Sequence, residues 1–152
     1  MRICDYLVER CILCEVKAKN KWEFFEEIAV CLAECLQLSA EKIRKVLEER
    51  ERLSSTAIGE EIAIPHSRLA GLKQIAIAAG IKRQGLEFEA LDKKPVKLIF
   101  VVLAPPEEST LYLKTLAQLA RLLKRKDIRE RLLEARTVEE FKKVLAEVDY
   151  EF

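Results

Sequence analysis

The sequence contains 152 residues, of which 50% are hydrophobic, with 27 Lys and Arg against 26 Asp and Glu. A chain of this size can bury a stable core without a metal or a disulfide, so we expect residues 1–152 to form a single domain. The net charge of +1 excludes an overall field that would hold nucleic acid or an anionic membrane.

The sequence also lacks the usual signals for secretion or membrane insertion. Asp5, Glu9 and Arg10 interrupt the N-terminal residues, which therefore lack the apolar core of a signal peptide. The longest apolar run, Leu98 to Pro106, is far shorter than the roughly 20 residues of a membrane-spanning helix. We expect a cytoplasmic protein with no direct membrane insertion.

The first part of the chain predicts a strand and two helices. The strand candidate is Ile12 to Val16. Asn20, followed by Glu23, is a cap for a helix over residues 22–36. A second helix is predicted to begin after Ser39 and to end near residues 51–53, before a loop of three hydroxyl residues, Ser54, Ser55 and Thr56.

The rest of the chain predicts strands and then helices. Runs rich in Ile, Val and Ala predict buried strands at residues 62–64, 74–81 and 96–103. Helices are predicted at residues 113–123 and 128–133. Thr137 and Glu140 form a capping box for a last helix that continues through Val144. The closely spaced central strands favour a mixed sheet. The fold class is therefore an α/β sandwich, with a mixed, mostly central β-sheet flanked by helices.

The five cysteines of the chain are expected to be thiols, since an odd number in a cytosolic chain argues against a disulfide framework. Cys11 and Cys14 form a C-x-x-C, but in an extended segment this spacing places them on opposite faces. Cys31 and Cys35 share one helix face among apolar residues, where thiols act as small core side chains. A metal or redox site is the alternative, and we expect no metal.

Basic residues gather between Arg121 and Arg131, but acidic residues such as Asp127 and Glu130 are interleaved with them. A solvated helix face explains this pattern better than a nucleic-acid patch does.

His66, the only histidine, follows a predicted buried strand in the sequence Ile-Ala-Ile-Pro-His. Pro65 has no backbone donor and is expected to end the strand pairing, which leaves His66 at the carboxyl end of a strand, where ligand sites gather. An imidazole there can act as a nucleophile or base near neutral pH. The alternative is a structural histidine on the surface or in the core.

The surroundings of His66 favour a phosphate. The loop from Ser54 to Gly59 carries three hydroxyl groups and a glycine, and can turn its amides towards an anion. Arg50 precedes this loop and Arg68 follows the histidine, so two guanidinium groups could reach a phosphoryl group on the imidazole. Solvated surface charge is the alternative reading of the two arginines.

The stretch from Arg50 to His66, RERLSSTAIGEEIAIPH, resembles the signature of the fructose/mannitol-type (type 2) enzyme IIA domains of the bacterial phosphotransferase system. This group includes the nitrogen-regulatory IIA proteins. The resemblance continues in residues 88–92, 95–103 and 113–116, and extends over the whole chain. It implies the mannitol-type enzyme IIA fold.

The resemblance also implies a function. In this family, the histidine that matches His66 accepts a phosphoryl group at Nε2 from an HPr-type phosphohistidine, and passes it to an enzyme IIB cysteine. The chain would be a phosphocarrier of the phosphoenolpyruvate-dependent sugar phosphotransferase system, a phosphotransferase with a phosphohistidine intermediate and no cofactor. Arg50 would then clamp the charge of the phosphoryl group, and Ser55 and Thr56 would donate hydrogen bonds to it.

The chain departs from the family at several positions. Relatives usually have Gly at the positions of Ala57 and Glu61, and many have a second histidine where alignment places Tyr112. A phenol donates a hydrogen bond to phosphate but cannot become a cation, so we expect phosphate acceptance with altered onward transfer. Arg68 is the candidate to supply the missing charge.

The alternative function is a nitrogen-regulatory IIA-like module that controls partner proteins by docking according to its phosphorylation state. Glu61, Tyr112 and the absence of a fused IIB or membrane domain favour this alternative. The expected partners are an HPr-type carrier and either enzyme IIB or a regulatory target protein.

Overall fold

The computed structural model describes residues 2–149, which form a short 3-10 helix, six strands and five α-helices. The 3-10 helix, Ile3–Tyr6, precedes the first strand. The strands are β1 (Leu7–Leu13), β2 (Ala57–Gly59), β3 (Ile62–Ala63), β4 (His66–Arg68), β5 (Ala76–Leu86) and β6 (Val96–Ala104). The α-helices are α1 (Lys21–Leu36), α2 (Ala40–Leu53), α3 (Thr110–Leu123), α4 (Lys126–Glu134) and α5 (Val138–Val148).

The strands form one mixed sheet in the order β1-β5-β6-β3-β2, and β4 also pairs with β6. The long central strands β5 and β6 are antiparallel. The pairs β1 with β5, β3 with β6 and β4 with β6 are parallel. The prediction of a mixed sheet is confirmed.

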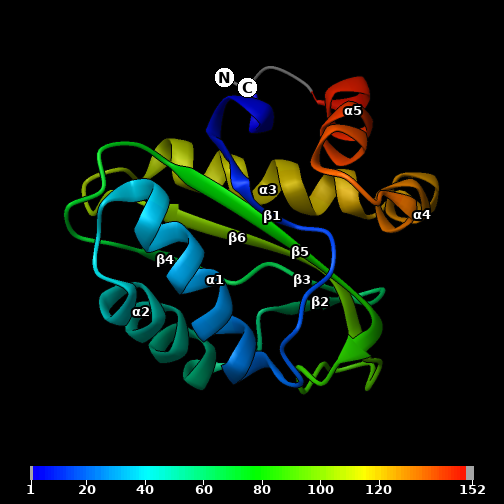
Figure 1. Ribbon diagram of the computed structural model, residues 1–152, viewed down its shortest axis with the longest axis horizontal. Coiled ribbons are helices and arrows are strands. Elements are labelled where there is room, and N and C mark those ends of the chain that lie inside the picture. The colour runs from blue at the N-terminus through cyan, green and yellow to red at the C-terminus, as the bar shows by residue number, and fades with distance from the viewer. Residues whose placement is uncertain (1, 150–152) are drawn as a thin grey trace.

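Helices cover both faces of the sheet (Figure 1). Alternate residues of β6 point to opposite layers: Phe100 and Val102 pack with α3 to α5, whereas Val101 and Leu103 pack with α1 and α2. Because both faces are covered, the strand has no polar side and reads as a continuous apolar run. This arrangement confirms the predicted α/β sandwich.

The helix starts follow from local capping. The side chain of Asn20 accepts a hydrogen bond from the amide of Glu23, and Thr137 accepts one from the amide of Glu140. Ser39 caps α2 in the same way. Each cap satisfies an amide that has no partner within its helix, which explains why the sequence located these starts correctly.

The position of the first strand was predicted wrongly. The strand β1 covers Leu7–Leu13 rather than residues 12–16, and its register against β5 shifts between Leu7 and Ile12. The irregularity leaves Glu9 and Arg10 exposed within the strand. Two adjacent charged residues interrupt the alternation of apolar and polar residues by which a strand is recognised in a sequence. The strand is therefore evident only from its pairing with β5.

A glycine in β5 lets α1 pack closely against the sheet. A Cβ on Gly80 would lie 2.8 Å from Cγ2 of Val16 and 2.9 Å from Cε1 of Phe24. Such contacts are too short for any larger residue, so the bare backbone of Gly80 sets how closely α1 approaches. Within residues 2–149, no helix is long and apolar enough to cross a membrane.

Candidate functional site

His66 begins β4, directly after the two-residue strand β3 and Pro65. Both short strands pair with β6 in one register, with Ile62 opposite Leu98 and His66 opposite Val102. The expectation that pairing ends at Pro65 was therefore wrong. The ladder continues because it uses the carbonyl of Pro65, which accepts a 2.9 Å hydrogen bond from the amide of Val102, and not its missing N–H.

A backbone hydrogen bond fixes the state of the His66 ring. Nδ1 lies 2.7 Å from the carbonyl oxygen of Ile64. Since a carbonyl can only accept, Nδ1 carries the proton and donates it. In the neutral ring, Nε2 then holds the lone pair and is the nucleophilic atom.

The surroundings favour the neutral form of this ring. Burial lowers the pKa of His66 below its ordinary value, and the positive charge of Arg50 lowers it further, while the hydrogen bond to Ile64 and the charge of Glu51 act in the opposite direction. A neutral imidazole is the form that can attack an electrophile.

Beside His66 lies a surface cavity of about 340 Å³. Its polar lining comes from Arg50, Ser55, Thr56 and His66. Thus the last turn of α2, the loop after it and the start of β4 meet at one place, as the sequence predicted for these four residues. The remaining lining is apolar and includes Ile58 and Ile64 together with three residues of α3, Leu116, Ala117 and Ala120.

Arg68 and Tyr112 form a second group next to the histidine. The rings of His66 and Tyr112 lie 6.2 Å apart with an edge-on arrangement. The guanidinium of Arg68 stacks 5.1 Å from the centre of the Tyr112 ring and donates a 3.2 Å hydrogen bond to the Ser109 hydroxyl. Neither Arg68 nor Tyr112 lines the 340 Å³ cavity. They lie beside the imidazole but outside the cavity that Arg50 lines.

The two arginines remain available to an anion. Arg50 donates a 3.0 Å hydrogen bond to the carbonyl of Ser54. Over residues 2–149, neither Arg50 nor Arg68 forms an ion pair with a carboxylate. A guanidinium without a carboxylate partner keeps donors free for a phosphoryl group.

The hydroxyl groups of Ser55 and Thr56 are engaged by the protein itself. Ser55 donates a 2.6 Å hydrogen bond to the carbonyl of Phe88, and Thr56 donates one of 2.6 Å to the carboxylate of Glu51. Glu51 also accepts from the backbone amide of Thr56. In this structure the two hydroxyls hold the loop in shape beside His66.

Behind this loop lies a buried ion pair that the sequence did not reveal. The ammonium of Lys21 contacts the carboxylate of Glu51 at 3.1 Å, with 5% and 0% of the two side chains exposed. Lys21 also donates to the carbonyl of Phe88, which accepts from Ser55 as well. In the sequence, the only sign that Glu51 is important is its position next to Arg50 in residues 50–66. Nothing in the sequence indicates that Lys21 is buried.

Glu61 faces away from the cavity. Its φ of 66° lies in the left-handed region, which explains why glycine suits this position. The Glu61 carboxylate pairs with Lys97 at 3.1 Å and lies in a different surface cavity, beside Arg129. Its negative charge is thereby neutralised away from His66. Ala57 has no such backbone requirement, since its φ is not positive.

Comparison with known proteins now identifies the family. Residues 5–148 match the family described as "Phosphoenolpyruvate-dependent sugar phosphotransferase system, EIIA 2". The chain belongs to this type 2 enzyme IIA family. Membership confirms the resemblance drawn from residues 50–66 and makes the chain, at the level of the family, a phosphotransferase-system component.

Three relatives of this enzyme IIA chain are informative. A "Nitrogen regulatory protein" of Bradyrhizobium diazoefficiens is 36% identical, with 96% of this chain and 95% of the relative covered. The nitrogen regulatory protein IIA-Ntr of Neisseria meningitidis has a crystal structure similar to this one, with a TM-score of 0.88, 36% identity, and coverage of 94% and 98%. The fructose-specific EIIABC component of Bacillus subtilis is 35% identical over 89% of this chain but only 21% of that longer protein.

Proposed function

We propose that residues 1–152 act as one enzyme IIA-like domain that accepts a phosphoryl group on Nε2 of His66 from an HPr-type phosphohistidine in the cytoplasm. The observation that carries this proposal is the 2.7 Å hydrogen bond from Nδ1 to the Ile64 carbonyl, beside two arginines that have no carboxylate partner among residues 2–149. Family membership supports the same chemistry.

The reaction forms one bond and breaks one. The lone pair of Nε2 attacks the phosphorus, the new N–P bond forms, and the donor imidazole leaves with the electrons of the old N–P bond. The proton on Nδ1 stays in its hydrogen bond to Ile64, which stabilises the positive charge that the ring gains. Arg50 neutralises the oxygens of the transferring group from the cavity side, and Arg68 does so from the Tyr112 side.

The roles of Ser55 and Thr56 in this proposal follow from their partners. Because both hydroxyls already donate to protein acceptors, these residues support the reaction by positioning the loop next to His66. Each hydroxyl has a single proton to donate, so either one can turn to the phosphoryl group only if it gives up its present acceptor.

Transfer of label from phosphoenolpyruvate tests the acceptor. With enzyme I and an HPr-type protein, the chain should gain one phosphoryl group per molecule in a form that is labile to acid and stable to base. His66→Ala should abolish the label, whereas Ser67→Ala, next to it, should retain it. Label that persists in His66→Ala would show that another residue is the acceptor.

The phosphoryl group has two candidate fates. Transfer to an enzyme IIB cysteine would make the protein a sugar phosphocarrier. The 36% identity to a nitrogen regulatory protein over 96% of the chain favours the second fate, in which phosphorylation controls docking to a regulatory target protein. Under this second proposal, His66→Ala and the phosphate-mimicking His66→Asp should bind such a target with different affinities. Equal affinities would contradict control by phosphorylation.

A further inference from the structure

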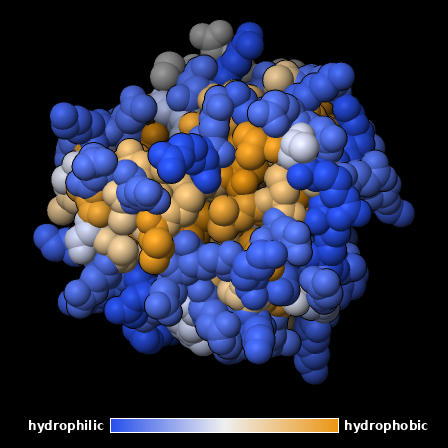
Figure 2. Space-filling view, viewed as in Figure 1, coloured by the Kyte–Doolittle hydropathy of each residue, from blue (hydrophilic) through white to orange (hydrophobic). Residues whose placement is uncertain are grey.

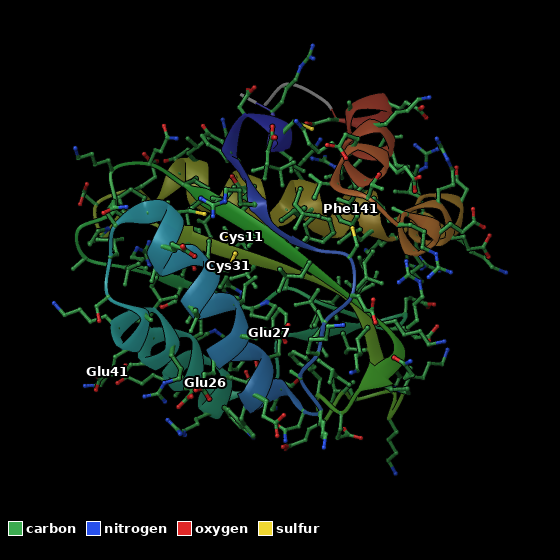
Figure 3. The ribbon with its side chains drawn as sticks, viewed as in Figure 1. Cys11, Glu26, Glu27, Cys31, Glu41 and Phe141 are labelled. Atoms are coloured by element: carbon green, nitrogen blue, oxygen red, sulfur yellow. The ribbon has the colours of Figure 1, made fainter. Side chains whose placement is uncertain are left out.

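Three of the five thiols meet between β1 and α1, outside the His66 site. Cys11 comes from β1, and Cys31 and Cys35 come from successive turns of α1. The sulfur of Cys11 lies 2.7 Å from that of Cys31 and 3.8 Å from that of Cys35, and all three sulfurs lie within 4.8 Å of one another. Figure 3 shows Cys11 and Cys31 side by side at this junction.

The sequence predicted only part of this arrangement. Cys11 and Cys14 do lie on opposite sides of the sheet, as their spacing indicated, because Cys11 packs with α1 and Cys14 packs with the layer of α3 to α5. The tertiary fold instead brings Cys11 close to Cys31 and Cys35. These two helix cysteines are half-buried rather than fully buried. All three are free thiols.

We propose that Cys11, Cys31 and Cys35 bind one thiophilic d¹⁰ metal ion, Cu(I) or Zn(II), as three thiolates. A bond of about 2.3 Å from the metal to each sulfur places the sulfurs of a tetrahedral site about 3.8 Å apart. The separation of 3.8 Å between the sulfurs of Cys11 and Cys35 already has this value. The close pair Cys11 and Cys31 needs to open by about 1 Å to reach it, a movement that a small side-chain rotation supplies.

The choice of ion follows from the ligand type. Thiolates select soft ions, and Cu(I) is satisfied by three of them. Zn(II) takes four ligands, so water at the half-exposed side would complete its shell. The backbone carbonyl of Arg10 accepts a 3.2 Å hydrogen bond from the thiol of Cys31. Its oxygen therefore lies beside the sulfur cluster and is an alternative to water as the fourth ligand of Zn(II).

An ion has a route to the cluster. Cys11 is fully buried, but Cys35 lines a surface cavity of about 410 Å³ between the beginning of β1, the end of α1 and residues 71–76. Figure 2 shows hydrophobic residues gathered in a hollow on the face that carries α1. The cavity at Cys35 gives an ion access to one sulfur, and the burial of Cys11 limits water around the cluster, which strengthens the metal–thiolate bonds.

The protons of the thiols make the binding depend on pH. Burial raises the pKa of both Cys11 and Cys31, so these two thiols hold their protons more firmly than an exposed cysteine does. Binding must therefore release a proton from each thiol that becomes a ligand, and the affinity should fall as the pH falls.

The test uses the reduced full-length chain under anaerobic conditions. Cu(I) and Zn(II) are titrated separately against chromogenic chelators, and X-ray absorption counts the sulfurs around each ion. We expect one ion per chain with three sulfur neighbours. The absorption spectrum distinguishes the two ions, since Cu(I) should show three sulfurs alone and Zn(II) an additional oxygen.

Serine variants assign the ligands. Cys31→Ser and Cys35→Ser should each weaken binding by at least the roughly 10–100-fold that loss of a supporting group costs at metal sites. Cys4→Ser and Cys14→Ser, which alter thiols outside the cluster, are the matched controls and should leave the affinity unchanged. Thermal unfolding of each variant verifies that it folds.

Two results would overturn the proposal. One is an affinity for both ions that Cys31→Ser and Cys35→Ser leave unchanged. The other is a fully reduced protein that binds neither ion. Phosphorylation of His66 should be unaffected in all four variants, because none of these cysteines lines the His66 cavity. The outcome is therefore independent of the proposed phosphoryl transfer.

Discussion

Lys21 and Glu51 form a buried ion pair of 3.1 Å between the first turn of α1 and the last turn of α2. Glu51 accepts hydrogen bonds from Thr56, and Lys21 donates to the carbonyl of Phe88, to which Ser55 also donates. The pair thus connects two helices to the loop beside His66. Positioning of the loop beside His66 therefore depends on charges that do not line the His66 cavity.

Removal of the Lys21 charge should destabilise the protein strongly. Lys21→Met leaves the fully buried carboxylate of Glu51 without its cation, which typically costs about 3–5 kcal/mol in the free energy of unfolding. Lys17→Met is the matched control, since Lys17 pairs with Glu15 on the surface, and its loss should be about 0–1 kcal/mol. Urea unfolding measures both, and equal losses would show that the buried pair contributes no more than the exposed one.

Arg50 should matter more for phosphoryl acceptance than its neighbour on α2. Arg50→Ala removes the guanidinium that lines the His66 cavity, and we expect the rate of acceptance to fall by about 10²–10³-fold. Arg52→Ala is the control, because Arg52 stacks on Trp22 and pairs with Glu48 instead. Rapid-quench measurement of phosphoryl transfer gives both rates. Similar rates for the two variants would contradict a role of Arg50 in charge neutralisation.

The single histidine makes the pH dependence directly measurable. An NMR titration of the His66 ring should give a pKa below the ordinary value of about 6.5, because burial and the charge of Arg50 both disfavour the imidazolium. Arg50→Gln should move the pKa upward. A pKa above that of free histidine, or a downward shift in Arg50→Gln, would contradict this account.

The same shift predicts how His66 affects stability. Since the pKa is lower in the folded state, the unfolded chain binds the proton more readily. Stability should therefore decrease as the pH falls from about 6.5 towards the folded pKa. Comparison of the wild type with His66→Gln by urea unfolding across this range isolates the effect, which should be absent above it.

Tyr112 should act mainly through its ring. Arg68 stacks on that ring, so Tyr112→Phe keeps the support for the guanidinium whereas Tyr112→Ala removes it. We expect Tyr112→Ala to slow acceptance by roughly 2–30-fold, which corresponds to the loss of a cation–π contact, and Tyr112→Phe to slow it less. A larger effect of Tyr112→Phe in the same rapid-quench measurement would instead assign the role to the phenol hydroxyl.

The strands show the limits of prediction from sequence. Apolar runs located β3 and β6, but β2 lay in the segment expected to be a loop, and β4 followed Pro65, where strand pairing was expected to end. These strands have only three residues each, and pairing with a neighbour is what holds them extended. In β5, residues 82–86 extend the strand beyond its predicted apolar run. The guanidinium of Arg83 donates hydrogen bonds there to the carbonyls of Cys14, Leu133 and Ala135. Such distant partners leave no local signal.

The sequence by itself determined the starts of α1, α2 and α5, the mixed sheet, and the grouping of Arg50, Ser55, Thr56 and His66 in one segment, whereas α3 and α4, which lack a capping side chain, begin three and two residues before their predicted starts. Caps and apolar periods act over a few residues, so they can be read locally. Only the tertiary structure decided which groups meet from separate segments: Lys21 with Glu51, Arg68 with Tyr112, and Cys11 with the two cysteines of α1. These contacts depend on how α1, α2 and α3 pack on the sheet, because that packing sets which distant side chains share one space.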